Sequence, residues 1–226
     1  MKSPVCHILL FIVAIVIAQA CDNEDYYRYG DFRYDMVTFM GNEDGAGDVY
    51  INYPVNDNTP VRLIDHAGAV SISNEDISVG DRLLLNYIVD KDNGDGTLDI
   101  TARSYAQVVT DSLRYTLNMS SLAQDSVSLN SIWRTGDYIN LYCRVKYTGV
   151  SRLLALVMDY DTWHNDTVHC YLSHNMMGAD AYFWRRCYMS FNISAVWNLQ
   201  SCKVVRVHLN DVAYPDRKYY DFIKTN

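Results

Sequence analysis

Positive charge is scarce in this sequence, which has 19 lysines and arginines against 27 aspartates and glutamates and a formal net charge of −8. That balance gives the chain no general attraction to nucleic-acid phosphates or to an anionic lipid surface, so we expect no nucleic-acid partner. Apolar residues are not scarce, since 49% of the 226 residues are hydrophobic. The composition therefore excludes extensive disorder, and the length allows one large or two small domains.

Long hydrophobic runs are almost absent. One uninterrupted apolar run extends from Ile8 to Ala18, which is too short for a stable membrane-spanning helix of about 20 residues. It follows Lys2 and ends at the small residues Ala18 and Ala20, an order typical of a secretory signal peptide. We therefore predict that residues 1–20 are a signal peptide.

The residue after this run is a cysteine. Ala18 to Ala20 would suit ordinary cleavage and release, but residues 17–21 also resemble a bacterial lipobox, with Ala18 in place of the usual Leu and Gln19 an imperfect match. We expect Cys21 to be the lipid attachment site that anchors an outer membrane lipoprotein, because acyl chains on this residue would give stable anchoring. Residues 21–33 form the acidic tether. The acidic cluster at 22–25 resembles a surface-export signal or is a solvated tether, so the protein faces the periplasm or lies on the cell surface.

Helical spacing is rare after Phe32, and short alternating runs separated by Gly, Asn, Asp and Pro predict β-strands. The candidate strands of the first half are Val49–Tyr53, Val61–Ile64, Arg82–Val89 and Leu98–Ala102. Residues 92–96 contain Asn, Asp and Gly, which tolerate positive φ, and predict a hairpin. The run Ser78–Leu83 is typical of a strand entry in which Gly80 turns the chain and Asp81 fixes the turn. Residues 34–110 are therefore predicted to form a small closed barrel of the OB type.

The second half begins with a polar segment. Residues 111–130 are rich in Ser, Asp and Asn and predict an inter-domain linker. Strands are expected again over Tyr138–Val145, Arg152–Met158, Val168–His174, Cys187–Ile193 and Lys203–Leu209. Their alternation predicts an antiparallel β-sandwich over 131–226. The predicted fold class is all-β, a small OB-like barrel followed by an antiparallel β-sandwich.

Three segments together resemble the NigD-like lipoproteins. They are the opening from Cys21 to Phe32, the run Ser78–Leu83 and the run Ser131–Leu141. The resemblance covers essentially the whole mature chain, and it implies an N-terminal OB-like barrel followed by a C-terminal β-sandwich. It implies no catalytic residues, and it suggests immunity to a bacteriocin as one role.

Catalytic and metal-binding patterns are missing from the sequence. There is no G-x-S-x-G elbow, no Gly-rich phosphate loop and no H-E-x-x-H. Residues 90–96 resemble a calcium loop, but the spacing required by an EF-hand fails and a hairpin explains them better. His164, His169 and His174 are five residues apart, so neighbours would point to opposite faces of a continuous strand. We expect no catalytic residue, no metal site and no cofactor.

The sequence leaves two kinds of covalent modification undecided, disulfide formation and O-glycosylation. Cys143, Cys170, Cys187 and Cys202 are an even set, compatible with disulfides in three connectivities or with buried free thiols. Cys187 and Cys202 flank an expected hairpin and are the candidate disulfide pair. Asp-Ser or Asp-Thr motifs resemble acceptors of bacterial O-glycosylation, or are ordinary turns. The candidate O-glycosylation residues are Ser112, Ser126 and Thr167.

These observations predict a non-catalytic, lipid-anchored cell-envelope protein. The abundance of tyrosine, 19 residues against 6 phenylalanines, suits contact surfaces as well as strand packing. We expect it to meet the membrane through its N-terminal lipid and to bind an unknown envelope protein or a glycan. The alternatives are an immunity lipoprotein and an envelope hydrolase that uses paired carboxylates.

Overall fold

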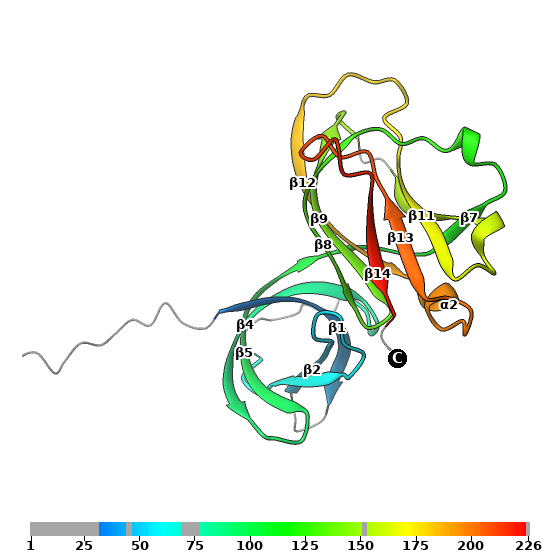
Figure 1. The fold of residues 1–226 in the computed structure, drawn as a ribbon. Helices are drawn as coiled ribbons and strands as arrows, with labels where there is room; N and C mark the ends of the chain where they lie inside the picture. The colour runs from blue at the N-terminus through cyan, green and yellow to red at the C-terminus, as the bar shows by residue number, and fades with distance from the viewer. Residues whose placement is uncertain (1–31, 44–46, 69–76, 151–152, 225–226) are drawn as a thin grey trace, which may run out of the picture. The chain divides into compact units, whose positions relative to one another are not determined.

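The first five strands form a closed barrel (Figure 1). The computed structural model describes residues 32–43, 47–68, 77–150 and 153–224. The barrel strands are β1 (Arg33–Glu43), β2 (Gly47–Asn52), β3 (Val61–Asp65), β4 (Arg82–Asp92) and β5 (Thr97–Gln107). They are arranged in the order β1-β2-β3-β5-β4, and β4 returns to pair with β1. This closure confirms the predicted barrel.

Alternation along the strands places one face of each in the barrel core. On β4, Leu83, Leu85 and Tyr87 are fully buried, and they pack in one cluster with residues of the other four strands. The predicted strand entry is also present, because the Ser78 amide donates to Asp81 Oδ2 at 2.8 Å and Gly80 has a φ of 97°. The short motif thus fixes where β4 begins.

The calcium-like run is the turn of a hairpin. β4 and β5 pair antiparallel on either side of it. Gly94 and Gly96 have φ values of 76° and 85°, which L-residues with a side chain rarely adopt. The Asp92 and Asp95 carboxylates accept hydrogen bonds from the Gly94 and Thr97 amides within this turn. The hairpin prediction is therefore confirmed.

The remaining strands form two facing sheets. One has the order β14-β13-β11-β10-β7 and the other the order β6-β12-β9-β8. Their bounds are β6 (Val109–Ser112), β7 (Arg114–Thr116), β8 (Val127–Thr135), β9 (Tyr138–Tyr147), β10 (Leu154–Asp159), β11 (Thr167–His174), β12 (Phe183–Asn192), β13 (Val204–His208) and β14 (Tyr219–Ile223). The expected sandwich is confirmed, but its sheets are mixed, because β6 with β12, β7 with β10 and β11 with β13 pair in parallel.

Three short helices complete the described chain. They are η1 (Met119–Ser121), η2 (Tyr160–Thr162) and α2 (Ser194–Trp197). Among the described residues no helix has the length and apolar character needed to cross a membrane.

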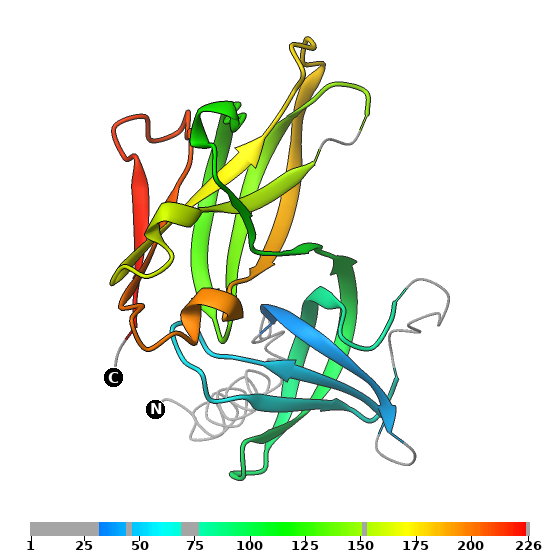
Figure 2. The ribbon, with the colours of Figure 1, turned by 90° about the vertical axis from the view of Figure 1, so that its right-hand side faces the viewer.

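The segment 111–130 differs from the expected linker. The chain passes from β5 through Val108 directly into β6, which pairs with β12, and then into β7, which pairs with β10 (Figure 2). The same segment ends inside β8. These strands are polar because β6 and β7 are short edge strands with exposed side chains, so hydrophobic alternation did not reveal them. The sandwich therefore begins at Val109 and not at residue 131.

The signal peptide, Cys21 and most of the expected tether lie outside the described residues. The tether was expected to extend to residue 33, but Arg33 already begins β1. The barrel thus starts one residue earlier than predicted.

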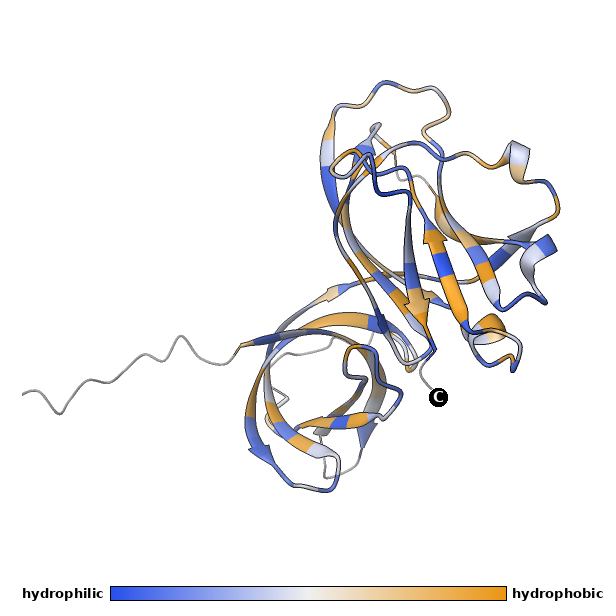
Figure 3. Ribbon diagram, in the orientation of Figure 1, coloured by the Kyte–Doolittle hydropathy of each residue, from blue (hydrophilic) through white to orange (hydrophobic). Residues whose placement is uncertain are grey.

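The core of the sandwich is apolar and contains free cysteines. Figure 3 shows hydrophobic and polar residues alternating along the strands of the sandwich. Cys143, Cys170 and Cys202 are buried in this core, Cys187 packs against it, and all four are free thiols. Cys187 on β12 faces Cys143 on β9 in the strand register, whereas Cys202 follows α2. The candidate Cys187–Cys202 disulfide is absent from the described structure, where both residues are the free thiols of the alternative interpretation, and sheet pairing gives Cys187 a different neighbour.

One buried arginine joins the barrel to the sandwich, and residues 32–226 cluster as one compact unit. Arg82, at the start of β4, is 2% exposed. Its Nε donates to Ser190 Oγ at 3.1 Å, and its Nη2 donates to Asn140 Oδ1 at 3.2 Å. Its Nη1 lies 3.2 Å from Thr38 Oγ1 on β1, and its guanidinium stacks 4.4 Å from the ring centre of Tyr138. The charge is thus buried among neutral acceptors from both parts, and burial lowers the Arg82 pKa to about 10.

Candidate ligand-binding site

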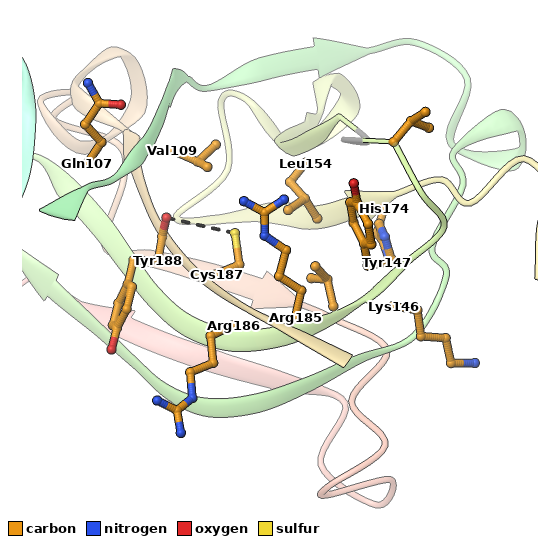
Figure 4. Close-up of a pocket in the computed structure, with 12 residues that line it drawn as sticks. Gln107, Val109, Lys146, Tyr147, Leu154, His174, Arg185, Arg186, Cys187 and Tyr188 are labelled. Atoms are coloured by element: carbon orange, nitrogen blue, oxygen red, sulfur yellow. Dashed lines mark hydrogen bonds between the residues drawn. The ribbon is translucent and has the colours of Figure 1, made fainter. Parts of the chain in front are cut away.

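The two sandwich sheets are left open along one side because their edge strands are short. β6 pairs with β12 only over 189–192, although β12 begins at Phe183. β7 pairs with β10 only over 157–159, although β10 begins at Leu154. The first halves of β12 and β10 therefore lack a neighbour on this side among the described strands. A cavity of about 220 Å³ lies at this opening (Figure 4).

Side chains from both sheets line the cavity. Val145 and Tyr147 come from β9, and Leu154 and His174 are direct partners on β10 and β11. Alternation explains their inward direction, since every second residue of β11 from Val168 to His174 is buried. The full lining is Gln107, Val109, Val145, Lys146, Tyr147, Val150, Leu154, His174, Arg185, Arg186, Cys187 and Tyr188, with no acidic residue. The cavity is therefore apolar and basic within a strongly acidic chain.

Arg185 brings a cation to the cavity. Figure 4 shows its guanidinium extending over the space toward Leu154, whereas the side chains of Arg186 and Lys146 point away. The Arg185 guanidinium lies 5.5 Å from the ring centre of Tyr147, and the Tyr147 hydroxyl donates to Gly149 O at 2.9 Å. Among the described residues Arg185 has no hydrogen bond or ion pair. A cation–π contact with the ring uses none of the five N–H donors of the guanidinium, so they stay available.

His174 adds a buried polar atom. Its side chain is 1% exposed, and its Nδ1 has no hydrogen-bond partner among the described residues. A buried polar atom of this kind normally has a partner, because leaving it unpaired costs free energy. A neutral imidazole nitrogen donates or accepts according to its tautomer. His174 is thus a second polar residue in the cavity wall, beside Arg185.

The thiols near the cavity are not activated. Burial raises the pKa of the Cys187 thiol, and the nearby Arg185 lowers it by a smaller amount. Burial also raises the pKa of Cys143 to about 12. A nucleophilic cysteine needs the opposite shift, toward the thiolate. The two groups therefore act as small apolar side chains in this wall.

His164, His169 and His174, the three histidines spaced five residues apart, do not lie together in the structure. His164 is exposed, His169 points to the outer face of its sheet and His174 points inward, as alternation predicted. The nearest partner of His169 is one that the sequence did not indicate, His208 on the neighbouring β13, at 3.1 Å between Nδ1 and Nε2. Among the described residues there is no group of three or more metal-ligating side chains.

The candidate O-glycosylation residues are separate from the cavity and from any linker. Ser112 is exposed at the end of β6, Ser126 is half-buried before β8, and Thr167 is half-buried as the first residue of β11. Ser112 is therefore the most accessible of the three hydroxyls.

The sequence did not indicate the cavity residues. Arg185 begins the single Arg-Arg pair in the chain, and His174 was considered only as a metal ligand. The Arg185-Arg186 pair, in a chain with an excess of acidic residues, was the one sequence feature that could have drawn attention to this region. Nothing in the sequence showed that these two residues, on different sheets, line the same space.

Known structures share this fold. A protein of unknown function from Bacteroides vulgatus is 18% identical, with a TM-score of 0.67 over 86% of this chain and 90% of that one. A NigD-like immunity protein from Bacteroides caccae is 19% identical, with a TM-score of 0.55 over 89% of this chain and 100% of the other. A candidate lipoprotein from Bacteroides fragilis is 11% identical, with a TM-score of 0.57 over 87% and 99% of the two chains. At these identities the similarity establishes the fold.

The family comparison is more specific. No curated protein matches the chain. The family model of the NigD-like C-terminal β-sandwich domain matches residues 108–222, which include the nine strands of the sandwich except Ile223, the last residue of β14. Because that match spans just over half of the 226 residues, this protein belongs to the NigD-like family.

Proposed function

We propose that this protein is a lipid-anchored protein of the cell envelope that binds a small ligand between its two sandwich sheets and catalyses no reaction. The observation that carries the proposal is the cavity, where the unpaired Arg185 guanidinium and the buried His174 come from different sheets and line the same space. Cavities that combine an apolar wall with a few convergent polar groups are typical binding sites.

A binding role fits the titratable groups better than catalysis. A hydrolase with paired carboxylates needs one acid whose pKa is raised. Among the described residues, hydrogen bonds are the largest cause that lowers the pKa of the carboxyl groups of Asp57, Asp99 and Asp221. These carboxylates are therefore held in the charged form and are poor proton donors.

Retention of a ligand tests the cavity. Val109 is 46% exposed and lines the cavity, so Val109→Trp would fill its mouth, and Val212, 48% exposed, offers the matched control Val212→Trp. Protein purified from envelopes would be extracted with solvent and the extract examined by mass spectrometry. We expect a small molecule that wild type and Val212→Trp retain and Val109→Trp loses. Identical extracts from all three would contradict the binding role.

The location in the envelope rests on residues 17–21 of the sequence and is supported by a structural relative described as a candidate lipoprotein. Cys21→Ala removes the thiol that would carry the acyl chains, so the protein should leave the membrane fraction. Protease treatment of intact cells would then separate a surface position from a periplasmic one. Retention of Cys21→Ala in membranes would contradict the lipid anchor.

Immunity to a secreted toxin is the second candidate. It is favoured by the family and by the name of the Bacteroides caccae relative, a NigD-like immunity protein. Deletion of the gene should then increase sensitivity to bacteriocins of neighbouring strains. Unchanged sensitivity to every bacteriocin tested would remove this candidate and leave the binding proposal in place.

A further inference from the structure

The cavity in the sandwich also indicates the chemistry of its ligand, an inference that rests on the proposed binding function. Arg185 is an arginine without an anion, since none of the lining residues is acidic. Arg186 and Lys146 lie on the neighbouring outer face and add positive potential near the mouth. A negatively charged group would therefore meet attraction and no opposing carboxylate.

The shape of the guanidinium favours a planar anion. The Arg185 guanidinium lies over the Tyr147 ring, at 5.5 Å from its centre, so the ring favours positions of the guanidinium beside the cavity. A planar fork of N–H donors matches a carboxylate with two parallel hydrogen bonds. Arg185 has no hydrogen-bond partner among the described residues, so it breaks no such bond within the protein when it binds a carboxylate.

The remaining walls favour a small apolar body. Val109, Val145 and Leu154 supply the apolar surface, and His174 supplies one polar atom at depth. The volume of about 220 Å³ is below the roughly 300–1,000 Å³ of pockets that hold drug-sized ligands. The cavity therefore suits a molecule about the size of a short branched or aromatic acid.

We propose that the ligand is a small free organic carboxylate, which places its carboxylate on Arg185 and its apolar body against Val109 and Leu154, close to His174. The opening beside β12 gives such a molecule a route from solvent, because no described strand covers the first half of that edge. Binding would give the Arg185 guanidinium the anion that it lacks among the described residues.

Matched probes test the charge. Titration calorimetry on the full mature protein in detergent would compare phenylacetate with phenylacetamide, and isovalerate with isovaleramide. The acid of each pair should bind roughly tenfold to a hundredfold more tightly than its amide, as expected for a charge-assisted pair in a partly enclosed site. An amide that binds as tightly as its acid would overturn the proposal.

Variants test the location. Arg185→Gln should weaken binding of the acids by about tenfold or more, and Arg185→Lys should recover part of the loss because it restores charge without the fork. Arg103 is exposed on β5 of the barrel and gives the matched control, Arg103→Gln, which should leave affinity unchanged. The ring nitrogens of His174 should shift in nitrogen-detected NMR spectra when acid is added. Unchanged affinity in Arg185→Gln would place the anion elsewhere and overturn the proposal.

The source of the carboxylate is tested with a peptide. An acetylated Gly-Gly-Leu peptide with a free carboxyl end should bind more weakly than isovalerate. Tighter binding of the peptide would mean that the ligand is the C-terminus of a peptide and not a free acid. If Val109→Trp loses the retained molecule but no acid binds to the wild-type protein, the proposal of a carboxylate ligand is wrong and the binding function stands. Failure of both experiments would remove the function as well.

Discussion

The barrel and the sandwich solve the problem of strand edges in different ways. The five barrel strands close on one another, so each has a neighbour on both sides. The sandwich has four edge strands, and two of them, β6 and β7, are only four and three residues long. Closure seals the core, whereas short edges leave backbone and interior side chains accessible. The opening that leads to the cavity therefore lies in the sandwich.

Arg82 and Arg185 differ in a similar way, since one is enclosed and the other is accessible. Arg82 is 2% exposed and donates hydrogen bonds to acceptors in both parts of the chain. Arg185 is exposed at the cavity and donates to no described residue. A buried charge with satisfied donors contributes to structure, while an oriented charge without a partner is available for binding.

The largest effect should come from weakening the connection between the two parts, which also includes the hydrogen bond from the Asn56 amide to Arg134 O and the one from Arg134 Nη1 to Asn58 Oδ1. Arg82→Met removes several hydrogen bonds made by a buried charge, each worth about 1.5–3 kcal/mol without full additivity, so we expect a loss of roughly 3 kcal/mol or more. All four tryptophans lie in the sandwich, so tryptophan fluorescence follows it alone, whereas circular dichroism follows both parts. In urea the two signals should coincide for wild type and separate for the variant.

The control for this prediction is Arg103→Met on the exposed face of β5. It should change the free energy of unfolding by no more than about 0.5 kcal/mol, as is usual for surface substitutions. Coincident transitions and an equally small loss in Arg82→Met would show that the buried hydrogen bonds do not couple the two parts.

The sequence predicted the elements whose hydrophobic pattern is strong. Tyr138–Val145 and Val168–His174 correspond closely to β9 and β11, because alternating burial leaves a period of two in the sequence. β6 and β7 were read as a linker, since short edge strands with exposed side chains carry no such period. The cavity was not predictable, because it depends on where β6 stops along β12 and β7 along β10. Pairing of this kind is parallel and remote in sequence.

Acidic pH should lower the free energy of unfolding of the sandwich, through the protonation of His208. Burial is the largest cause that lowers the His208 pKa from 6.5 to about 4, with further lowering by His169 and Arg206 and a smaller opposing effect of Asp221. The unfolded chain therefore takes up this proton near pH 6.5, and the folded chain does so only near pH 4. Stability should be complete above the higher value and fall as the pH is lowered between the two values. Because His208 is only half-buried, we expect a loss of about 1–2 kcal/mol.

Urea unfolding followed by tryptophan fluorescence at neutral pH and near pH 4.5 would measure this loss. His208→Gln has no imidazole to protonate and should remove most of the difference, while His164→Gln, at an exposed position, should retain it. An equal loss of stability in wild type and His208→Gln would assign the acid response to other groups.

The smallest effect is expected at Arg185, and it tests the availability of that side chain most directly. Arg185→Gln removes a contact with the Tyr147 ring and no hydrogen bond, so the free energy of unfolding should fall by about 0.5 kcal/mol or less. The measurement is the urea midpoint of the variant beside wild type. A loss of roughly 2 kcal/mol would mean that Arg185 supports the fold as Arg82 does, and its guanidinium would not be free for an anion. If the free energy of unfolding is unchanged, any loss of carboxylate binding in Arg185→Gln comes from the site and not from a weakened fold. The contrast between Arg82 and Arg185 requires this outcome.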